Sequence, residues 1–183
     1  MSNRLLTRAT ALAASLATLA LAAGPAAADR DLVAHGKSWS LQLQGDGSSL
    51  KKRNADVAVV DPDEVRSPGK LKTKANGGKR AVLAYISVGE AENYRSYMKK
   101  GKKQWLSEKE QGWAGNKMVK YWDPEWKSIV KSRVRKAMAQ GYDGVYLDRV
   151  DTYENVKAPG GSRAEMIKLV KEGHVRGWDD PRM

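Results

Sequence analysis

Short runs of apolar residues, each closed by a turn residue or an acid, recur along this chain and predict buried β-strands. The longest run is residues 81–88 (AVLAYISV), which ends at Gly89 and Glu90. Further strands are predicted at residues 39–43, 57–60, 118–121 and 145–147, of which 118–121 has the weakest pattern. Because helical stretches separate several of these runs, the pattern favours a parallel sheet that is covered on both faces.

The clearest predicted helix spans residues 124–140. Asp123 can accept backbone N–H bonds as its N-cap, and Pro124 suits the first helical position because its missing N–H costs nothing there. Apolar residues then recur at helical spacing between lysines and arginines, and Gly141 suits the position just past the helix end. The segment therefore predicts a strand–helix–strand unit that leads into residues 145–147.

The remaining segments are less regular. Residues 164–172 predict a second helix, and residues 92–98 are compatible with the start of another. Residues 70–80 predict a poor helix that runs into a turn at two adjacent glycines, and residues 99–112 are polar and predict a loop. No repeat or linker divides the sequence, so the pattern predicts a single domain.

The segment GYDGVYLDRVD, residues 141–151, carries the strongest chemical signal. Its apolar strand runs straight into Asp148, and Asp151 follows three positions later. Acids at the carboxyl ends of parallel strands converge on one mouth, which is how α/β barrels build catalytic sites. Asp148 is therefore predicted to be catalytic, and the protein is predicted to be an enzyme.

Three more acids stand at or just beyond predicted strand ends. Asp61, Glu90 and Glu92 are expected to line the same mouth. A structural alternative is open at each position. Asp61 precedes a proline and can simply shape a turn, while Arg95 and Arg149 can act as ion-pair partners that hold these acids ionised.

The amino-acid composition limits the kinds of reaction and binding partner that the chain can have. The chain has no cysteine, which excludes disulfides, thiol nucleophiles and thiolate metal sites. Its 33 basic and 21 acidic side chains give a net charge of +12, which favours polyanions non-specifically. The lysines are scattered and no nucleic-acid recognition motif accompanies them, so no specific nucleic-acid partner is predicted.

Metal and cofactor chemistry is not expected. An oxygen-rich Ca2+ or Mg2+ site at Asp61, Glu90 and Asp148 is conceivable, but no histidine supports it. His35 and His174 lie near the two ends of the segment 29–183, and neither belongs to a motif. We therefore predict no metal and no cofactor.

The first 28 residues match the pattern of a secretory signal peptide. Arg4 and Arg8 give a basic start, residues 9–23 form an apolar run, and small residues lead to a cleavage site after Ala28. The run has about 15 residues, below the roughly 20 that cross a bilayer, so no stable membrane anchor is expected. A secreted or periplasmic mature domain over residues 29–183 is predicted.

Five ordered sequence blocks resemble one enzyme family. They are WSLQLQG from residue 39, VAVVDPD from 57, VLAYISVGEAENYRSY from 82, GNKMVKYWDPEW from 115 and GYDGVYLDRVDTYE from 141. Together they are similar to blocks of the family 114 glycoside hydrolases, which include endo-α-1,4-polygalactosaminidase and related secreted glycosidases. The resemblance implies a (β/α)8 barrel of TIM type, a polysaccharide substrate and a catalytic aspartate that matches Asp148. A catalytic glutamate would come from a later strand.

The resemblance implies that the strand-end residues belong to the active site of a glycosidase. Such an enzyme needs two carboxyl groups beside the scissile bond. The other acids can hydrogen-bond sugar hydroxyls or pair with ammonium groups of an aminosugar polymer. Tyr94, Trp122 and Tyr153 offer flat faces for sugar rings, although Trp122 can equally belong to the core, and Asp123 is favoured as a helix cap. The candidate substrate-binding residues are Asp61, Tyr85, Glu90, Glu92, Tyr94, Arg95, Trp122 and Asp151.

The chain also departs from the family pattern. A barrel of this type typically has about 250 residues and rarely fewer than about 200, more than the 183 residues of this chain. After Glu172 the sequence GHVRGWDDPRM predicts no strand, as a frameshift or premature stop would leave it. We therefore expect the N-terminal half to five-eighths of a barrel, without the second catalytic carboxylate. Glu154 and Glu165 are poor substitutes, because one lies in a predicted loop and the other on a predicted helix.

Three functions remain open at this point. The first is a secreted, endo-acting glycosidase for a galactosamine-containing or other polysaccharide, impaired by loss of the C-terminal half. The second is a non-catalytic carbohydrate-binding remnant. The third is a basic secreted protein that binds polyanions. The pattern does not predict an oligomeric state.

Overall fold

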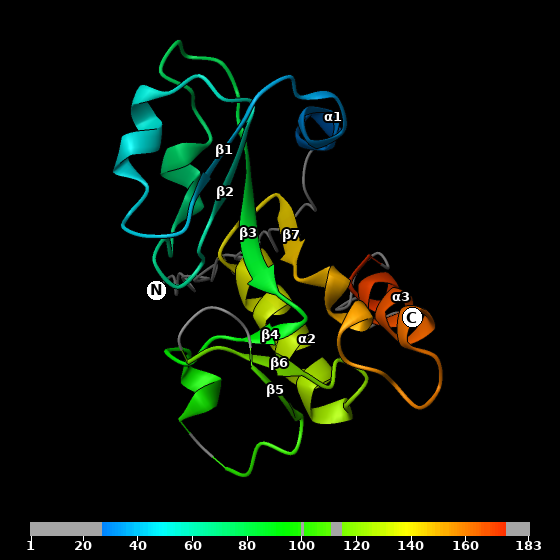
Figure 1. Ribbon diagram of the computed structural model, residues 1–183. Coiled ribbons are helices and arrows are strands. Elements are labelled where there is room, and N and C mark those ends of the chain that lie inside the picture. Colours follow the sequence, from blue (N-terminus) through cyan, green and yellow to red (C-terminus); the bar gives the residue numbers. More distant parts are fainter. Residues whose placement is uncertain (1–26, 100, 111–114, 175–183) are drawn as a thin grey trace, which may run out of the picture.

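The computed structural model describes residues 27–99, 101–110 and 115–174, and its centre is a four-stranded parallel sheet (Figure 1). The strands, in spatial order, are β1 (Trp39–Gln42), β2 (Val57–Val60), β3 (Ala81–Ser87) and β7 (Gly144–Asp148). Every neighbouring pair is parallel, which confirms the predicted sheet. All seven residues of β3 are buried, which explains why its apolar run is continuous rather than alternating.

Helix α2 (Pro124–Ala139) packs against β3 and β7 (Figure 1). The Asp123 side chain accepts hydrogen bonds from two backbone N–H groups of the first turn, at 2.8 and 3.3 Å, and is the N-cap as predicted. Val130 and Val134 share one core cluster with Ile86 of β3. Gly141 has a φ of 89°, the left-handed conformation expected just past a helix end. The predicted helix and both of its boundary signals are therefore confirmed.

A second, antiparallel sheet lies beyond the carboxyl end of β3. It contains β4 (Glu90–Ala91), β6 (Lys117–Val119) and β5 (Leu106–Glu110), in the order β4-β6-β5. The prediction of a loop over residues 99–112 is wrong, because β5 lies within that range. The sequence LSEKE has no apolar alternation and becomes a strand by pairing with β6, a tertiary effect that the local pattern does not carry.

Aromatic side chains beside the small sheet pack against α2. Trp105, just before β5, and Trp126 of α2 are each 1% exposed, and their ring centroids lie 4.8 Å apart. Tyr97 meets Trp126 edge on at 5.6 Å. The Trp126 indole N–H also donates a 2.7 Å hydrogen bond to the Val88 carbonyl. This packing fixes the segment that leaves β3 at the mouth of the sheet.

Short helices complete the described chain. They are α1 (Ala27–His35), α3 (Ser162–His174) and the 3-10 turns η1 (Ser48–Lys52), η2 (Pro68–Leu71), η3 (Ser96–Met98) and η4 (Val150–Glu154). Helix α3 contains the predicted helix 164–172. The 3-10 turn η2 ends at Leu71, and the chain then makes a turn closed by an isolated Thr73–Lys79 bridge, which agrees with the prediction of a poor helix that runs into a turn.

The predicted signal peptide lies almost wholly outside the described residues, which begin at Ala27. Among the helices that are described, none has the length and apolar character needed to cross a membrane.

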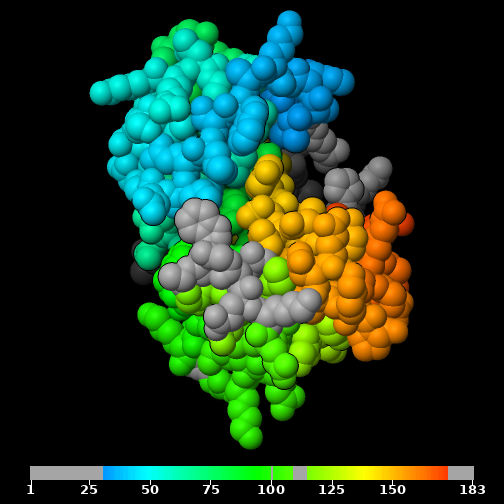
Figure 2. All heavy atoms as spheres, viewed as in Figure 1, coloured from blue at the N-terminus to red at the C-terminus, as the bar shows by residue number. Residues whose placement is uncertain are grey.

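The parallel sheet is open at both sides in the described part of the chain, since β1 and β7 each pair with one strand. Trp39 of β1 is 63% exposed and Tyr146 of β7 is 40% exposed. In the space-filling view, the blue and cyan segments that carry β1 and β2 lie above the yellow and orange segment that runs from β7 to α3 (Figure 2). Four neighbouring parallel strands of this kind correspond to the first half of a (β/α)8 barrel.

Candidate active site

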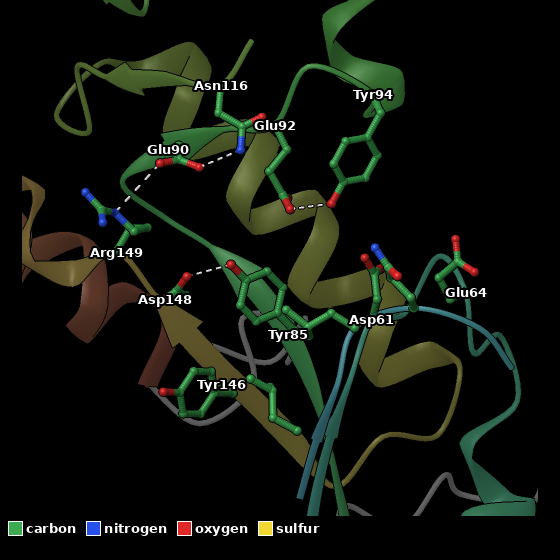
Figure 3. Close-up of a pocket in the computed structure, with 13 residues that line it drawn as sticks. Asp61, Glu64, Tyr85, Glu90, Glu92, Tyr94, Asn116, Tyr146, Asp148 and Arg149 are labelled. Atoms are coloured by element: carbon green, nitrogen blue, oxygen red, sulfur yellow. Dashed lines mark hydrogen bonds and ion pairs between the residues drawn. The ribbon is translucent and has the colours of Figure 1, made fainter. Parts of the chain in front are cut away.

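A cavity of about 820 Å³ lies at the carboxyl ends of the parallel strands (Figure 3). Five acids line it: Asp61, Glu64, Glu90, Glu92 and Asp148. The other lining residues are Leu41, Leu43, Gln44, Tyr85, Tyr94, Asn116, Tyr146 and Arg149. The structure thus brings together the four acids that the sequence predicts to share one mouth.

Asp148 is the last residue of β7, and a tyrosine of the neighbouring strand holds it. The Tyr85 hydroxyl donates a 2.5 Å hydrogen bond to Oδ2 of Asp148. Burial, and then this hydrogen bond, raise the pKa of Tyr85 far above its usual value, so the hydroxyl stays protonated. The Tyr85 ring stacks on that of Tyr146 at 6.5 Å, which limits its movement. Asp148 is therefore fixed at one oxygen, and its carboxylate lines the cavity.

Glu90 is a buried carboxylate on the small sheet, 6% exposed. Its Oε1 accepts a 2.8 Å hydrogen bond from the Asn116 side chain, and its Oε2 lies 3.9 Å from Nε of Arg149. Burial is the largest effect on its pKa, which is raised. Glu92 and Asp148 add to this rise, while Asn116 and Arg149 act against it.

Arg95 forms a buried ion-pair network behind the cavity wall. Its guanidinium contacts Oδ2 of Asp61 at 2.7 Å, Oε2 of Glu92 at 2.8 Å and Oδ2 of Asp63 at 2.8 Å. The side chain is only 2% exposed, so it does not face the cavity. The structure therefore agrees with the ion-pair alternative for Arg95 and differs from the prediction that it binds substrate.

Trp122 and Asp151, two of the predicted substrate-binding residues, lie away from the cavity wall. Trp122 packs against the core, with its ring 5.0 Å from that of Tyr121 in an edge-on contact. Asp151 lies in η4, is 55% exposed and faces Arg149 at 3.8 Å. Tyr94, in contrast, lines the cavity and its hydroxyl donates to Glu92. The predicted substrate-binding roles of Trp122 and Asp151 have no support from this geometry.

Several cavity residues were not predicted. Tyr146 shares a strand face with Asp148, since they are two residues apart in β7, so strand periodicity could have found it. Asn116 reaches the cavity from the small sheet, and no local pattern signals that position. The sequence indicates Arg149 only as an ion-pair partner, yet its side chain lines the cavity.

The described residues show no arrangement of side chains for a metal ion. They contain no group of three or more His, Cys, Asp or Glu side chains arranged to hold a metal ion. Asp61, Glu90 and Asp148 therefore do not form such a group, although they line one cavity.

The sequence model of the glycoside-hydrolase family GH114 matches residues 19–174, so the chain belongs to this family. It is 39% identical over 144 residues to an uncharacterized protein of Deinococcus radiodurans and 36% identical over 148 residues to one of Methanocaldococcus jannaschii. These alignments cover 72% and 73% of this chain but only 46% and 43% of the relatives. The chain thus spans less than half the length of these curated relatives.

The fold is similar to two solved structures. One is Aspergillus fumigatus Ega3 in complex with galactosamine, with a TM-score of 0.59 and 26% identity over 73% of this chain and 52% of Ega3. The other is the glycoside hydrolase domain of PelA from Pseudomonas aeruginosa, with a TM-score of 0.63 and 21% identity over 76% of this chain and 55% of that domain. These similarities confirm the predicted fold, a partial (β/α)8 barrel.

Proposed function

We propose that this chain supplies the acid-lined half of an endo-glycosidase site for a galactosamine-containing polysaccharide, with Asp148 as a catalytic carboxylate. The observation that carries the proposal is the cavity itself, where five carboxylates meet at the carboxyl edge of the sheet in a chain of net charge +12. A local excess of acid in a basic protein attracts cationic ligands, and ammonium groups pair with carboxylates. The binding of galactosamine by the structurally similar Ega3 supports this choice of sugar.

Asp148 suits a direct role in glycoside hydrolysis. The reaction needs one carboxyl group as acid and another as nucleophile or base. Tyr85 holds one oxygen of Asp148 by a donated hydrogen bond, which fixes the carboxylate at the strand end. Two glutamates of the cavity, Glu90 and Glu92, are proposed to contact the sugar, and the second reacting carboxyl group is the glutamate that the family resemblance places on a later strand.

The 183-residue chain is proposed to bind the polysaccharide while turning it over slowly. Its described sheet has four parallel strands, and the expected catalytic glutamate belongs to a later strand. An acid and its nucleophilic partner act as a unit, so one without the other loses most of the rate. An open cleft also admits water, which weakens the electrostatic stabilisation of a transition state.

The test is a hydrolysis assay on polygalactosamine and a panel of neutral and anionic polysaccharides. The 183-residue chain is compared with a version extended by the C-terminal half of a family relative. The extended version should hydrolyse polygalactosamine, and Asp148→Asn should lower its kcat by at least about a thousandfold. The exposed Asp151→Asn is the matched control and should keep full activity.

Other outcomes distinguish the alternatives. If both versions bind galactosamine oligomers without turnover, the chain is a carbohydrate-binding module. If only anionic polymers bind, with a steep loss of affinity in added salt, it is a polyanion-binding protein. Full activity in the Asp148→Asn variant would refute the catalytic assignment.

We also propose that residues 1–28 direct export, which the basic, apolar and small-residue order of that segment supports. Mass spectrometry of the protein recovered outside the producing cells should find Asp29 as the first residue. An intact Met1 in that fraction would contradict the proposal.

A further inference from the structure

Glu90 and Arg149 form a charged pair that is not joined by a hydrogen bond. Oε2 of Glu90 lies 3.9 Å from Nε of Arg149, as the dashed line between them shows (Figure 3). Both atoms are shielded from water, and neither has a hydrogen-bond partner among the described residues. The Glu90 side chain is 7% exposed and lines the cavity, so its unused oxygen is a buried acceptor at the cavity wall.

The backbone around this pair is tightly constrained. A Cβ at Gly89 would lie 2.1 Å from the Arg149 carbonyl oxygen and 2.2 Å from Oγ1 of Thr152, so the two loops touch. The Thr152 hydroxyl donates a 3.2 Å hydrogen bond to the Gly89 carbonyl. Arg149 has a φ of 63°, in the left-handed region that most residues avoid. Loop contacts of this kind hold the strained backbone in place and set Arg149 beside Glu90.

The spacing of the two atoms suits a single bridging oxygen. A separation of 3.9 Å is too long for a direct hydrogen bond, but one oxygen about 2.8 Å from each atom fits it. A hydroxyl group can donate to Glu90 and accept from Arg149 at the same time, whereas an ammonium group can only donate. Arg149 also repels a cation. Its side chain is 25% exposed, so a rotation of this side chain can admit the ligand.

We propose that Glu90 and Arg149 together bind one hydroxyl group of the sugar and reject an amino group at that position. The inference rests on the proposed function, because it assumes that a galactosamine unit occupies the cavity. It assigns the pair a role in specificity. The sugar must turn a hydroxyl toward Glu90 and Arg149 and its ammonium group toward another acid that lines the cavity, such as Glu92. Arg149 is thereby a substrate-contacting residue and not only a counter-ion.

The experiment measures Kd by NMR titration of the 183-residue chain with galactosamine and with its 3-, 4- and 6-deoxy derivatives. The variants are Glu90→Gln, Arg149→Gly and the double variant. Glycine accepts the left-handed backbone of residue 149 without strain, so Arg149→Gly should keep the loop conformation although it removes the cation beside Glu90. Arg66→Gly, which removes an exposed arginine outside the cavity, is the matched control for lost charge.

Each single variant should weaken galactosamine binding about tenfold, and the double variant should also lose about tenfold rather than a hundredfold, because both residues bind the same hydroxyl. One of the deoxy derivatives lacks the hydroxyl group that the pair binds. Its Kd for the parent chain should equal the Kd of galactosamine for Arg149→Gly. The Kd of this derivative should also be the same for the parent chain and for Arg149→Gly. Arg66→Gly should bind like the parent.

Three results would overturn the inference. Additive losses would mean that the two residues do not share a hydroxyl. Unchanged binding by Glu90→Gln and Arg149→Gly, combined with lost binding by Asp148→Asn, would remove the inference while leaving the proposed function standing. If the parent chain binds neither galactosamine nor its oligomers, both proposals fall.

Discussion

The hydroxyl of Tyr85 and the carboxylate of Asp148 meet across the β3–β7 pair, 2.5 Å apart, at the edge where the cavity opens. Tyr85→Phe removes this hydrogen bond while keeping the ring stacked on Tyr146. Hydrogen bonds to charged groups contribute about 1.5–3 kcal/mol, so kcat of the extended enzyme should fall about 10- to 100-fold. Thermal unfolding should also move to a lower temperature, because the same hydrogen bond contributes to the stability of the fold.

Tyr146→Phe is the matched control for this prediction, because it also removes one phenolic hydroxyl from the cavity wall and keeps the ring. It should retain most of the activity. Equal losses in the two variants would show that the hydroxyls act on the cavity in general and not through Asp148.

Arg95 is predicted to be essential for stability. It is 2% exposed and neutralises Asp61 and Glu92 from behind the cavity wall. Arg95→Gln leaves these buried carboxylates without their cation, which costs about 3–5 kcal/mol when one partner of a buried pair is removed. Chemical denaturation at neutral pH should show this loss in the free energy of unfolding.

Arg66→Gln, at an exposed position, should change the free energy of unfolding by less than about 0.5 kcal/mol. An Arg95→Gln variant as stable as the parent would mean that other groups neutralise Asp61 and Glu92.

The centre of the large sheet could be predicted from the sequence because β2 and β3 are largely buried and their apolar runs are continuous. β3 is the clearest case, with seven buried residues in a row. The small sheet could not be predicted in the same way. Strand β5 is mostly polar and exists through its pairing with β6, which depends on where the tertiary fold brings the two segments.

The residues of the site also divide into those that the sequence could predict and those that it could not. Asp148 could be predicted because a strand delivers it directly to the mouth. Asp151 follows by three residues and looks equivalent in the sequence, but the left-handed Arg149 redirects the chain into η4 and leaves Asp151 exposed. Trp122 and Trp126 both lie near the start of α2, and only the packing decides that neither faces the cavity.

Gly89 should tolerate no side chain. The Cβ of an alanine would meet backbone and Thr152 atoms at 2.1–2.6 Å, contacts that require the β3–β4 turn or the β7–η4 loop to move. Gly89→Ala should therefore cost at least about 2 kcal/mol in the free energy of unfolding. The variant should also lose galactosamine binding, because the turn carries Glu90.

Gly69→Ala is the control for that substitution. No atom lies within 4 Å of a Cβ built there, so alanine should be neutral or stabilise the chain by up to about 1 kcal/mol. A Gly89→Ala variant that unfolds and binds like the parent would show that the two loops are not locked together.

Asp56 should give the stability of the chain a specific acid dependence. Its carboxylate contacts Lys74 at 2.7 Å and accepts a hydrogen bond from the backbone N–H of Lys37 at 2.9 Å, next to the start of β1. The hydrogen bond from Lys74 is the largest cause that lowers its pKa, to about 2 from 3.8. A lowered pKa means that the unfolded chain binds the proton more readily, so the stabilisation is present above pH 3.8 and is lost as the pH falls through about 2.

Asp56→Asn should therefore unfold at a lower temperature than the parent at pH 6, and this difference in unfolding temperature should disappear between about pH 4 and pH 2. Calorimetric scans across this range test the prediction, with the exposed Glu154→Gln as control. A gap that stays constant with pH would mean that the carboxylate acts by shape and not by charge.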